Sequence, residues 1–232
     1  KNDKRHSRKS TSSVNLVLKH KNTFKLFSEN KTKKLIKKSI EKGLRKAISY
    51  SSYRNLISDL IASGKSSGPI QSEDLLNYSM LNDRRMTRLD KKIQLRQETL
   101  LIVKKIDKPI TWLVLSEGWC GDAAQTLPVI NKIANESDFI TLKIIFRDEH
   151  EELMNYFLTN GGKSIPKLLV LNSENEVLNT WGPRPDKASK MVQDYKNKHG
   201  QLDATFKQEL QVWYNKDKGV NIQENMLGLL TN

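Results

Sequence analysis

Trp119-Cys120-Gly121-Asp122-Ala123 lies where a predicted strand gives way to a predicted helix. Residues 109–116 form a short apolar run typical of a buried strand, and apolar residues recur at helical spacing over residues 123–134. The single cysteine of the chain therefore stands at the start of a helix. Unpaired backbone N–H groups and the helix dipole favour a thiolate there. The alternative is that Cys120 is a small buried apolar residue, as free cysteines often are.

Positive charge is concentrated at the N-terminus of this 232-residue chain. Residues 1–46 contain 16 Lys or Arg and 3 Asp or Glu, a net charge of +13, whereas the other 186 residues contain 24 and 23, a net charge of +1. We interpret residues 1–33 as a basic, disordered arm. It could contact nucleic acid, anionic lipid or acidic protein, or be a solvated tail. A nucleic-acid partner is expected, if at all, only through residues 1–46, because the remainder lacks a basic excess.

Several classes of protein are disfavoured by the composition. No run of about 18 apolar residues is present, so no membrane span and no membrane partner are expected. One cysteine cannot form an internal disulfide, which favours a reducing compartment and predicts a cytoplasmic location. The four histidines show no metal-ligand spacing, and no phosphate-cradling glycine pattern occurs. We therefore expect neither a metal nor a cofactor.

The region upstream of the motif has a helical pattern. Apolar residues at helical spacing predict helices over residues 34–47, from about residue 52 to Ser63-Gly64, over residues 72–92 and over residues 98–105. Together these form a helical extension, residues 34–107, which we expect to pack on the core. A basic cluster near the end of the third helix is read as a solvated face, with nucleic-acid binding as the alternative.

From residue 108 onward, strands and helices alternate. Strands are predicted over residues 110–116, 139–146, 167–171 and 176–181, and helices over residues 121–135, 148–159, 186–198 and 203–214. Residues 215–232 are expected to be a C-terminal tail. The order β-α-β-α-β-β-α predicts an α/β domain over residues 108–214, with a mixed central sheet covered on both faces.

Three segments of this domain resemble the thioredoxin family. Trp119-Cys120-Gly121-Asp122-Ala123 resembles the active-site motif Trp-Cys-Gly-Pro-Cys, and Pro128 stands where thioredoxins carry a helix proline. Residues 164–171 resemble the thioredoxin segment that holds a cis-proline, here Ile165-Pro166. The resemblance implies a thioredoxin-like fold over residues 108–214. With the helical extension, the chain looks like a bacterial subgroup that carries Trp-Cys-Gly-Asp.

Two departures from the family pattern bear on the chemistry. Ala123 occupies the place of the second, resolving cysteine, and Val114 replaces the buried acid that moves a proton in thioredoxins. Thiol–disulfide exchange passes through a mixed disulfide that a second thiol then cuts. The chain is therefore not expected to be a self-sufficient dithiol thioredoxin.

Monothiol redox work is the first functional hypothesis. Cys120, as a thiolate, would attack a disulfide or a peroxide, and an external thiol would resolve the product. The partner would be a thiol- or disulfide-bearing protein or a low-molecular-weight thiol. Arg184 could pair with the thiolate or with a carboxylate of that thiol. Asp122 is expected to cap the helix, and Trp119 to shield the sulfur. The expected partner contacts are Trp119, Gly121, Asp122, Ile165, Pro166 and Arg184.

A redox-inactive protein-binding module on the same fold is the alternative hypothesis. Loss of the resolving cysteine and of the buried acid favours it, whereas retention of Trp-Cys-Gly and Ile-Pro favours redox chemistry. The two hypotheses differ in the thiolate fraction of Cys120 at neutral pH.

Overall fold

The computed structural model describes residues 30–231. Most of the expected basic arm, residues 1–29, lies outside this range, as does residue 232. Residues 30–44 are helical, so the first helix begins and ends earlier than the expected 34–47. The C-terminal part of this helix packs on the core, where the side chain of Ile40 is fully buried.

A four-stranded mixed sheet forms the centre of the molecule, as the sequence predicts. The strand order is β2-β1-β3-β4, with β1 parallel to β2 and antiparallel to β3, and β3 antiparallel to β4. Val114 lies opposite Ile144 and Leu168 in the middle of this sheet, and its side chain is fully buried. The strands are β1 (Ile110–Ser116), β2 (Ile140–Phe146), β3 (Lys167–Leu171) and β4 (Val177–Trp181).

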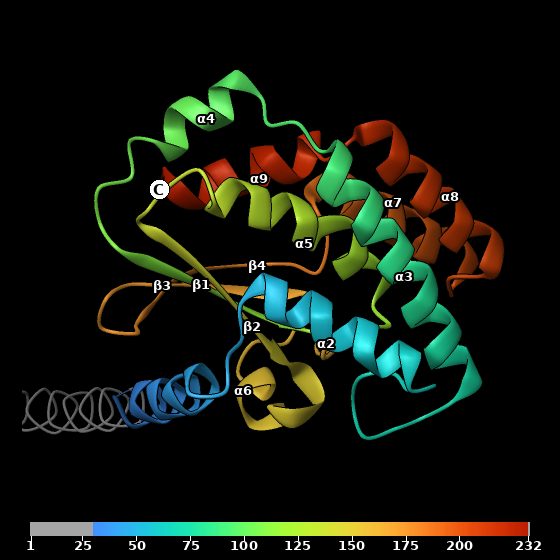
Figure 1. Ribbon diagram of the computed structural model, residues 1–232, viewed down its shortest axis with the longest axis horizontal. Helices are drawn as coiled ribbons and strands as arrows, with labels where there is room; N and C mark the ends of the chain where they lie inside the picture. Colours follow the sequence, from blue (N-terminus) through green and yellow to red (C-terminus); the bar gives the residue numbers. More distant parts are fainter. Residues whose placement is uncertain (1–29, 232) are drawn as a thin grey trace, which may run out of the picture.

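Helices cover both faces of the sheet, which confirms the expected thioredoxin-like α/β architecture (Figure 1). Helices α5 (Gly121–Ala134), α7 (Asp186–His199), α8 (Ala204–Asp217) and α9 (Val220–Leu230) lie on one side. The helix of residues 30–44 and α6 (Glu151–Asn155) lie on the other. The remaining helices are α2 (Tyr50–Ala62), α3 (Glu73–Lys92) and α4 (Gln97–Val103).

Helices α2 and α3 are joined to each other by ion pairs, and α3 packs on the core helix α5. Ser49 caps α2, because its side chain accepts a hydrogen bond from the N–H of Ser52 at 3.1 Å. Arg54 of α2 forms ion pairs with Asp83 and Asp90 of α3. Helix α3 in turn packs along α5, so the helical extension supports the helix that carries the cysteine at its start.

The helix expected over residues 148–159 is much shorter in the structure. A 3-10 turn (Arg147–Glu149) precedes α6, and α6 ends at Asn155. Beyond it, Thr159 and Gly162 exchange both backbone hydrogen bonds, at 2.9 and 3.0 Å, around residues 160 and 161, which have positive φ angles. The prediction of a helix up to residue 159 is therefore wrong, because the chain around residues 159–162 forms a turn closed by these backbone hydrogen bonds.

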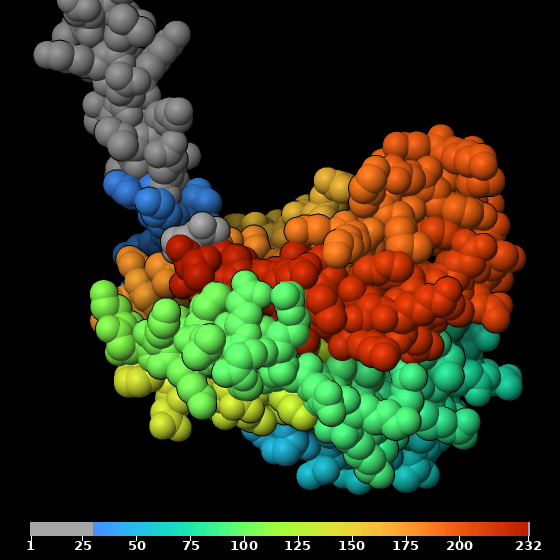
Figure 2. Space-filling model, turned by 90° about the horizontal axis from the view of Figure 1, so that it is seen from above, coloured from blue at the N-terminus to red at the C-terminus, as the bar shows by residue number. Residues whose placement is uncertain are grey.

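Residues 215–232 were expected to be a C-terminal tail, but residues 220–230 form helix α9. Seen from above, α9 lies between the green segment that contains α4 and the orange segment that contains α7 (Figure 2). Ile222 and Met226 are almost fully buried. Burial of such a side chain contributes about 1.5–3 kcal/mol to the free energy of unfolding.

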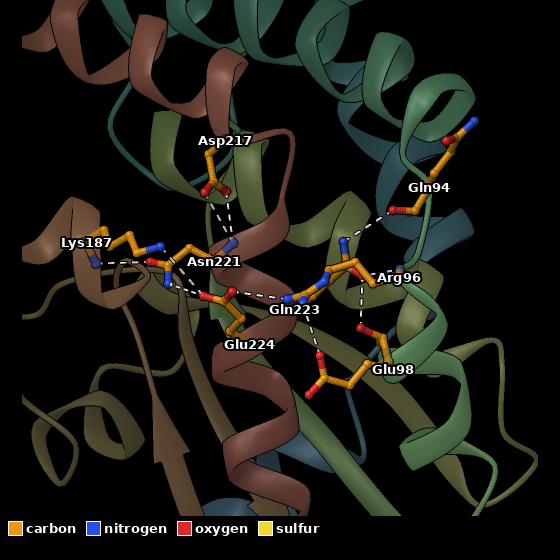
Figure 3. A network of polar contacts seen from close by, with 9 residues as sticks. Gln94, Arg96, Glu98, Lys187, Asp217, Asn221, Gln223 and Glu224 are labelled. Carbon is orange, nitrogen blue, oxygen red and sulfur yellow. Dashed lines mark hydrogen bonds and ion pairs between the residues drawn. The ribbon is translucent and has the colours of Figure 1, made fainter.

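Helix α9 also buries polar side chains, which are held by hydrogen bonds to other segments. Gln223 is fully buried, but its Oε1 accepts from the N–H of Arg96 at 2.8 Å and from Thr99 Oγ1 at 3.0 Å. Its Nε2 donates to the carbonyl of Gln94 at 3.2 Å (Figure 3). Asn221 accepts from the N–H of Lys187 at 3.0 Å. These hydrogen bonds tie α9 to the segments before α4 and at the start of α7.

Candidate functional site

Cys120 is the N-cap residue of α5, at the end of the turn that follows β1. Its Sγ atom accepts a hydrogen bond from the N–H of Ala123 at 3.4 Å. The residue is 8% exposed, so little of the thiol reaches solvent. The structure therefore places Cys120 at the strand–helix junction that the sequence predicts, but its side chain is buried.

The segment around Ile165 is brought against Cys120 from 45 residues away. The Ile165–Pro166 peptide bond is cis, and the Cys120 thiol donates to the carbonyl of Ile165 over 3.2 Å. Only a protonated thiol can donate this bond, so the contact stabilises the neutral form of the sulfur.

Asp122 does not cap α5, contrary to the expectation from sequence. Its carboxylate forms an ion pair with Arg184 at 2.6 Å and accepts a hydrogen bond from the hydroxyl of Tyr214 at 3.0 Å. The cap position is taken by Cys120 itself. Arg184 thus pairs with a carboxylate of its own chain, where the sequence suggested the thiolate or a carboxylate of the partner. Tyr214, on α8, was missed because nothing in the local sequence of that helix marks a partner for Asp122.

The surroundings of Cys120 oppose ionisation. Burial, and then the negative charge of Asp122, raise the pKa of the thiol to about 12. The N–H groups of Ala123 and Asp122 and the charge of Arg184 act in the opposite direction and are outweighed. Burial likewise raises the pKa of the Asp122 carboxyl, although Arg184 and Tyr214 both lower it. The expected preference for a thiolate is therefore not met in this structure.

A second buried carboxylate, Glu117, lies three residues before Cys120 and was not singled out from the sequence. It is fully buried, accepts from the hydroxyl of Ser67, and accepts from the N–H of Asp148 at 3.0 Å. Burial raises the pKa of Glu117. These two hydrogen bonds hold the loop before α3 and the turn after β2. Glu117 therefore does not take over the role of the buried acid, whose position in this chain is occupied by Val114.

A cavity of about 710 Å³ opens over the cysteine, and we call it the Cys120 groove. Arg147 lies across the ring of Trp119 at one wall, with its Cζ 5.0 Å from the ring centroid. Pro166 is the one expected site residue that does not line the groove; the others do. The lining includes Trp119, Cys120, Gly121, Asp122, Ile165 and Arg184, and also Leu75, Tyr78, Arg85, Arg147, Lys163, Leu202, Phe206, Lys207, Leu210 and Gln211.

Within residues 30–231, no group of three or more His, Cys, Asp or Glu side chains is arranged to hold a metal ion. In the same range, no helix has the length and apolar character needed to cross a bilayer.

The fold and the site define an α/β protein with one thiol at a strand–helix junction, facing a cis-proline segment. A thioredoxin family model matches residues 68–196, more than half of the chain. The chain therefore belongs to the thioredoxin family. The matched region begins before α3, so it includes α3 and α4 together with the strands.

Two solved structures are similar to this chain. A protein of unknown function from Pseudomonas aeruginosa is 17% identical, covers 78% of this chain and 96% of its own, and has a TM-score of 0.49. An HIV epitope scaffold is 18% identical, covers 78% of this chain and 97% of its own, and has a TM-score of 0.48. No curated protein matches the chain.

Proposed function

We propose that this protein is a thioredoxin-fold binding module, in which the Cys120 groove holds a ligand beside a neutral thiol and no redox cycle is run. The hydrogen bond from the Cys120 thiol to the Ile165 carbonyl, at 3.2 Å, carries the proposal. It holds the proton on the sulfur of a residue that is only 8% exposed. A neutral, covered thiol is a poor nucleophile, because the thiolate is the reactive form.

The absence of two catalytic partners supports the same proposal. The sequence holds one cysteine, so no second thiol of this chain can cut a mixed disulfide. Val114 is fully buried in the sheet and has no proton to give or take. By contrast, the groove is well suited to binding, because its volume of about 710 Å³ falls within the range of small-ligand sites.

Monothiol redox chemistry is the second candidate, and the position of Cys120 at the start of α5 favours it. The N–H of Ala123 donates to the sulfur, and Arg184 lowers the pKa of the thiol. If a partner displaced Ile165 from the sulfur, Cys120 could attack the partner's disulfide, forming a mixed disulfide and releasing one thiolate. An external thiol would then cut that mixed disulfide. On this candidate the partner is a thiol- or disulfide-bearing protein or a low-molecular-weight thiol, in a reducing compartment such as the cytoplasm.

The motif supports a further assignment within the family. On the residues Trp119 to Ala123 alone, we place the chain in the single-cysteine Trp-Cys-Gly-Asp-Ala subgroup that occurs in bacteria. Either candidate function is compatible with this placement.

The pH dependence of alkylation separates the two candidates. The full chain is treated with iodoacetamide across a series of pH values, with Cys120→Ser as the blank. The midpoint of the rate profile gives the pKa of the thiol, whatever the absolute rate. A midpoint well above the free-thiol value of about 8.5 supports the binding module. A midpoint below that value, together with a mixed disulfide formed with oxidised glutathione, would establish monothiol chemistry instead.

A further inference from the structure

We propose that Arg85 and Gln211 form an anion subsite in the Cys120 groove, which selects small organic anions with an apolar body. This inference rests on the proposed role of the groove as a ligand-binding site. It adds the chemical class of the ligand and the residues that recognise it.

Two side-chain donors converge beside Gly121, the first residue of α5. A methyl group placed on the Gly121 Cα would lie 3.7 Å from Arg85 Nη1 and 3.7 Å from Gln211 Nε2. The two donors come from α3 and α8, two helices that are far apart in the sequence. The positive end of the α5 dipole adds to their attraction for an anion.

Both donors are held in place by buried amide side chains. Asn82 is 1% exposed, accepts from Arg85 Nη1 at 3.0 Å and donates to the carbonyl of Gly118 at 3.1 Å. Gln125 is 3% exposed and donates to Gln211 Oε1 at 2.9 Å. That bond occupies the oxygen of Gln211 and leaves its NH2 group as the free end. A preorganised pair of donors loses little conformational entropy when an anion binds.

The charge of Arg85 is not balanced by the protein. Among the other cations of the groove, Arg184 pairs with Asp122 at 2.6 Å, Arg147 with Asp148 at 2.7 Å and Lys163 with Glu151 at 3.1 Å. Within the described part of the chain, neither Arg85 nor Lys207 has a carboxylate within ion-pair distance. Burial and the neighbouring Arg88 lower the pKa of Arg85, which is the signature of a half-buried cation without a counterion.

An apolar surface runs from Arg85 along α3. Tyr78 precedes Arg85 by seven residues, so the two lie on the same helix face, separated by roughly 10 Å along the axis. Tyr78 is 50% exposed, and Leu75 lies one turn further along the same wall. Leu202, Phe206 and Leu210 add further apolar surface to the lining of the groove. A fitting ligand therefore has one anionic group at Arg85 and an apolar body of about this length.

A pair of fluorescent probes that differ in one sulfonate tests the proposal. 8-Anilinonaphthalene-1-sulfonate is an apolar anion, and N-phenyl-1-naphthylamine is its neutral counterpart. Both are titrated into the full chain and into Arg85→Gln, with Arg84→Gln as the matched control, since Arg84 is exposed on the same helix and does not line the groove. Loss of the charge-assisted contact should weaken the anionic probe about tenfold in Arg85→Gln. The neutral probe should bind Arg85→Gln and the native chain equally, which also shows that the variant is folded.

The outcomes distinguish failure of the subsite from failure of the groove. If Arg85→Gln and Arg84→Gln weaken the anionic probe equally, the Arg85 subsite is refuted while the groove stands. If neither probe binds, or if Ala204→Trp, which fills the groove from an exposed position, leaves both probes bound, the groove itself is refuted. Displacement of the anionic probe by decanoate supports a small acid. Displacement only by an acidic peptide, such as acetyl-Phe-Phe-Glu-Phe amide, would overturn that assignment in favour of a protein partner.

Discussion

Replacement of Gly182 by Ala should destabilise the protein far more than a typical glycine substitution. Gly182 follows β4 with a φ angle of +113°, and a Cβ atom there would lie 2.1 Å from the carbonyl oxygen of Pro166. An L-residue at positive φ costs about 1–2 kcal/mol, and overpacking typically adds about 1–3 kcal/mol. Because the obstructing atom belongs to the backbone, no side-chain rotation relieves the contact. The two costs together give an expected loss of about 2–5 kcal/mol in the free energy of unfolding.

The matched control for this prediction is Gly161→Ala. Gly161 also has a positive φ angle, of +76°, but a Cβ atom there would meet nothing within 4 Å. It should therefore show the backbone cost alone, about 1–2 kcal/mol. Denaturant unfolding of both variants gives the difference, which should equal the overpacking cost of about 1–3 kcal/mol, or about 2–12 °C in Tm for a chain of this size. Equal losses in the two variants would refute the close approach of Gly182 to Pro166.

Three further predictions concern the site and the C-terminal helix. Because burial raises the pKa of Cys120 to about 12, the folded chain keeps a proton that the unfolded chain loses above about pH 8.5. Above that pH, the free energy of unfolding of the native chain should fall by up to about 1.4 kcal/mol per pH unit relative to Cys120→Ser. Parallel pH profiles of stability for the native chain and the variant would contradict this. Asp122→Asn removes a negative charge that raises the pKa of Cys120, and it frees Arg184 from its ion pair. Alkylation of Cys120 at pH 8 should therefore become faster, and slower alkylation would contradict this account of the pKa. Gln223→Leu leaves the N–H of Arg96 without its acceptor and should cost about 1–3 kcal/mol in denaturant unfolding, whereas an unchanged stability would show that water replaces the side chain.

The thioredoxin-like core could be predicted from sequence because its signals are local. Short apolar runs mark the four strands, and the turn between β3 and β4 is marked by the polar residues 172–175. The position of Cys120 before α5 follows from the same periodicity. Ile165 could be placed near Cys120 only through the resemblance to thioredoxins, since no local rule joins residues 45 positions apart.

The electrostatics of the site could not be predicted, because they depend on partners distant in the chain. Asp122 forms an ion pair with Arg184 and accepts a hydrogen bond from Tyr214, and these partners lie 62 and 92 residues further along the chain. Burial of Cys120, which dominates its pKa, results from packing that no five-residue motif encodes. Similarly, Gln223 is polar in sequence and fully buried in the fold, because its partners Arg96 and Thr99 lie 127 and 124 residues earlier in the chain.

Helix α5, which carries the thiol at its start, is packed between α3 and α9. The segment that matches the family, residues 68–196, contains α3 but ends before α9. We therefore expect that the matched region does not fold as a separate unit, because α5 at its centre also packs on α9, beyond its end. Amide protons of α5 should exchange with solvent only through global unfolding, together with those of α9. Limited proteolysis should accordingly release no stable fragment that corresponds to the matched segment.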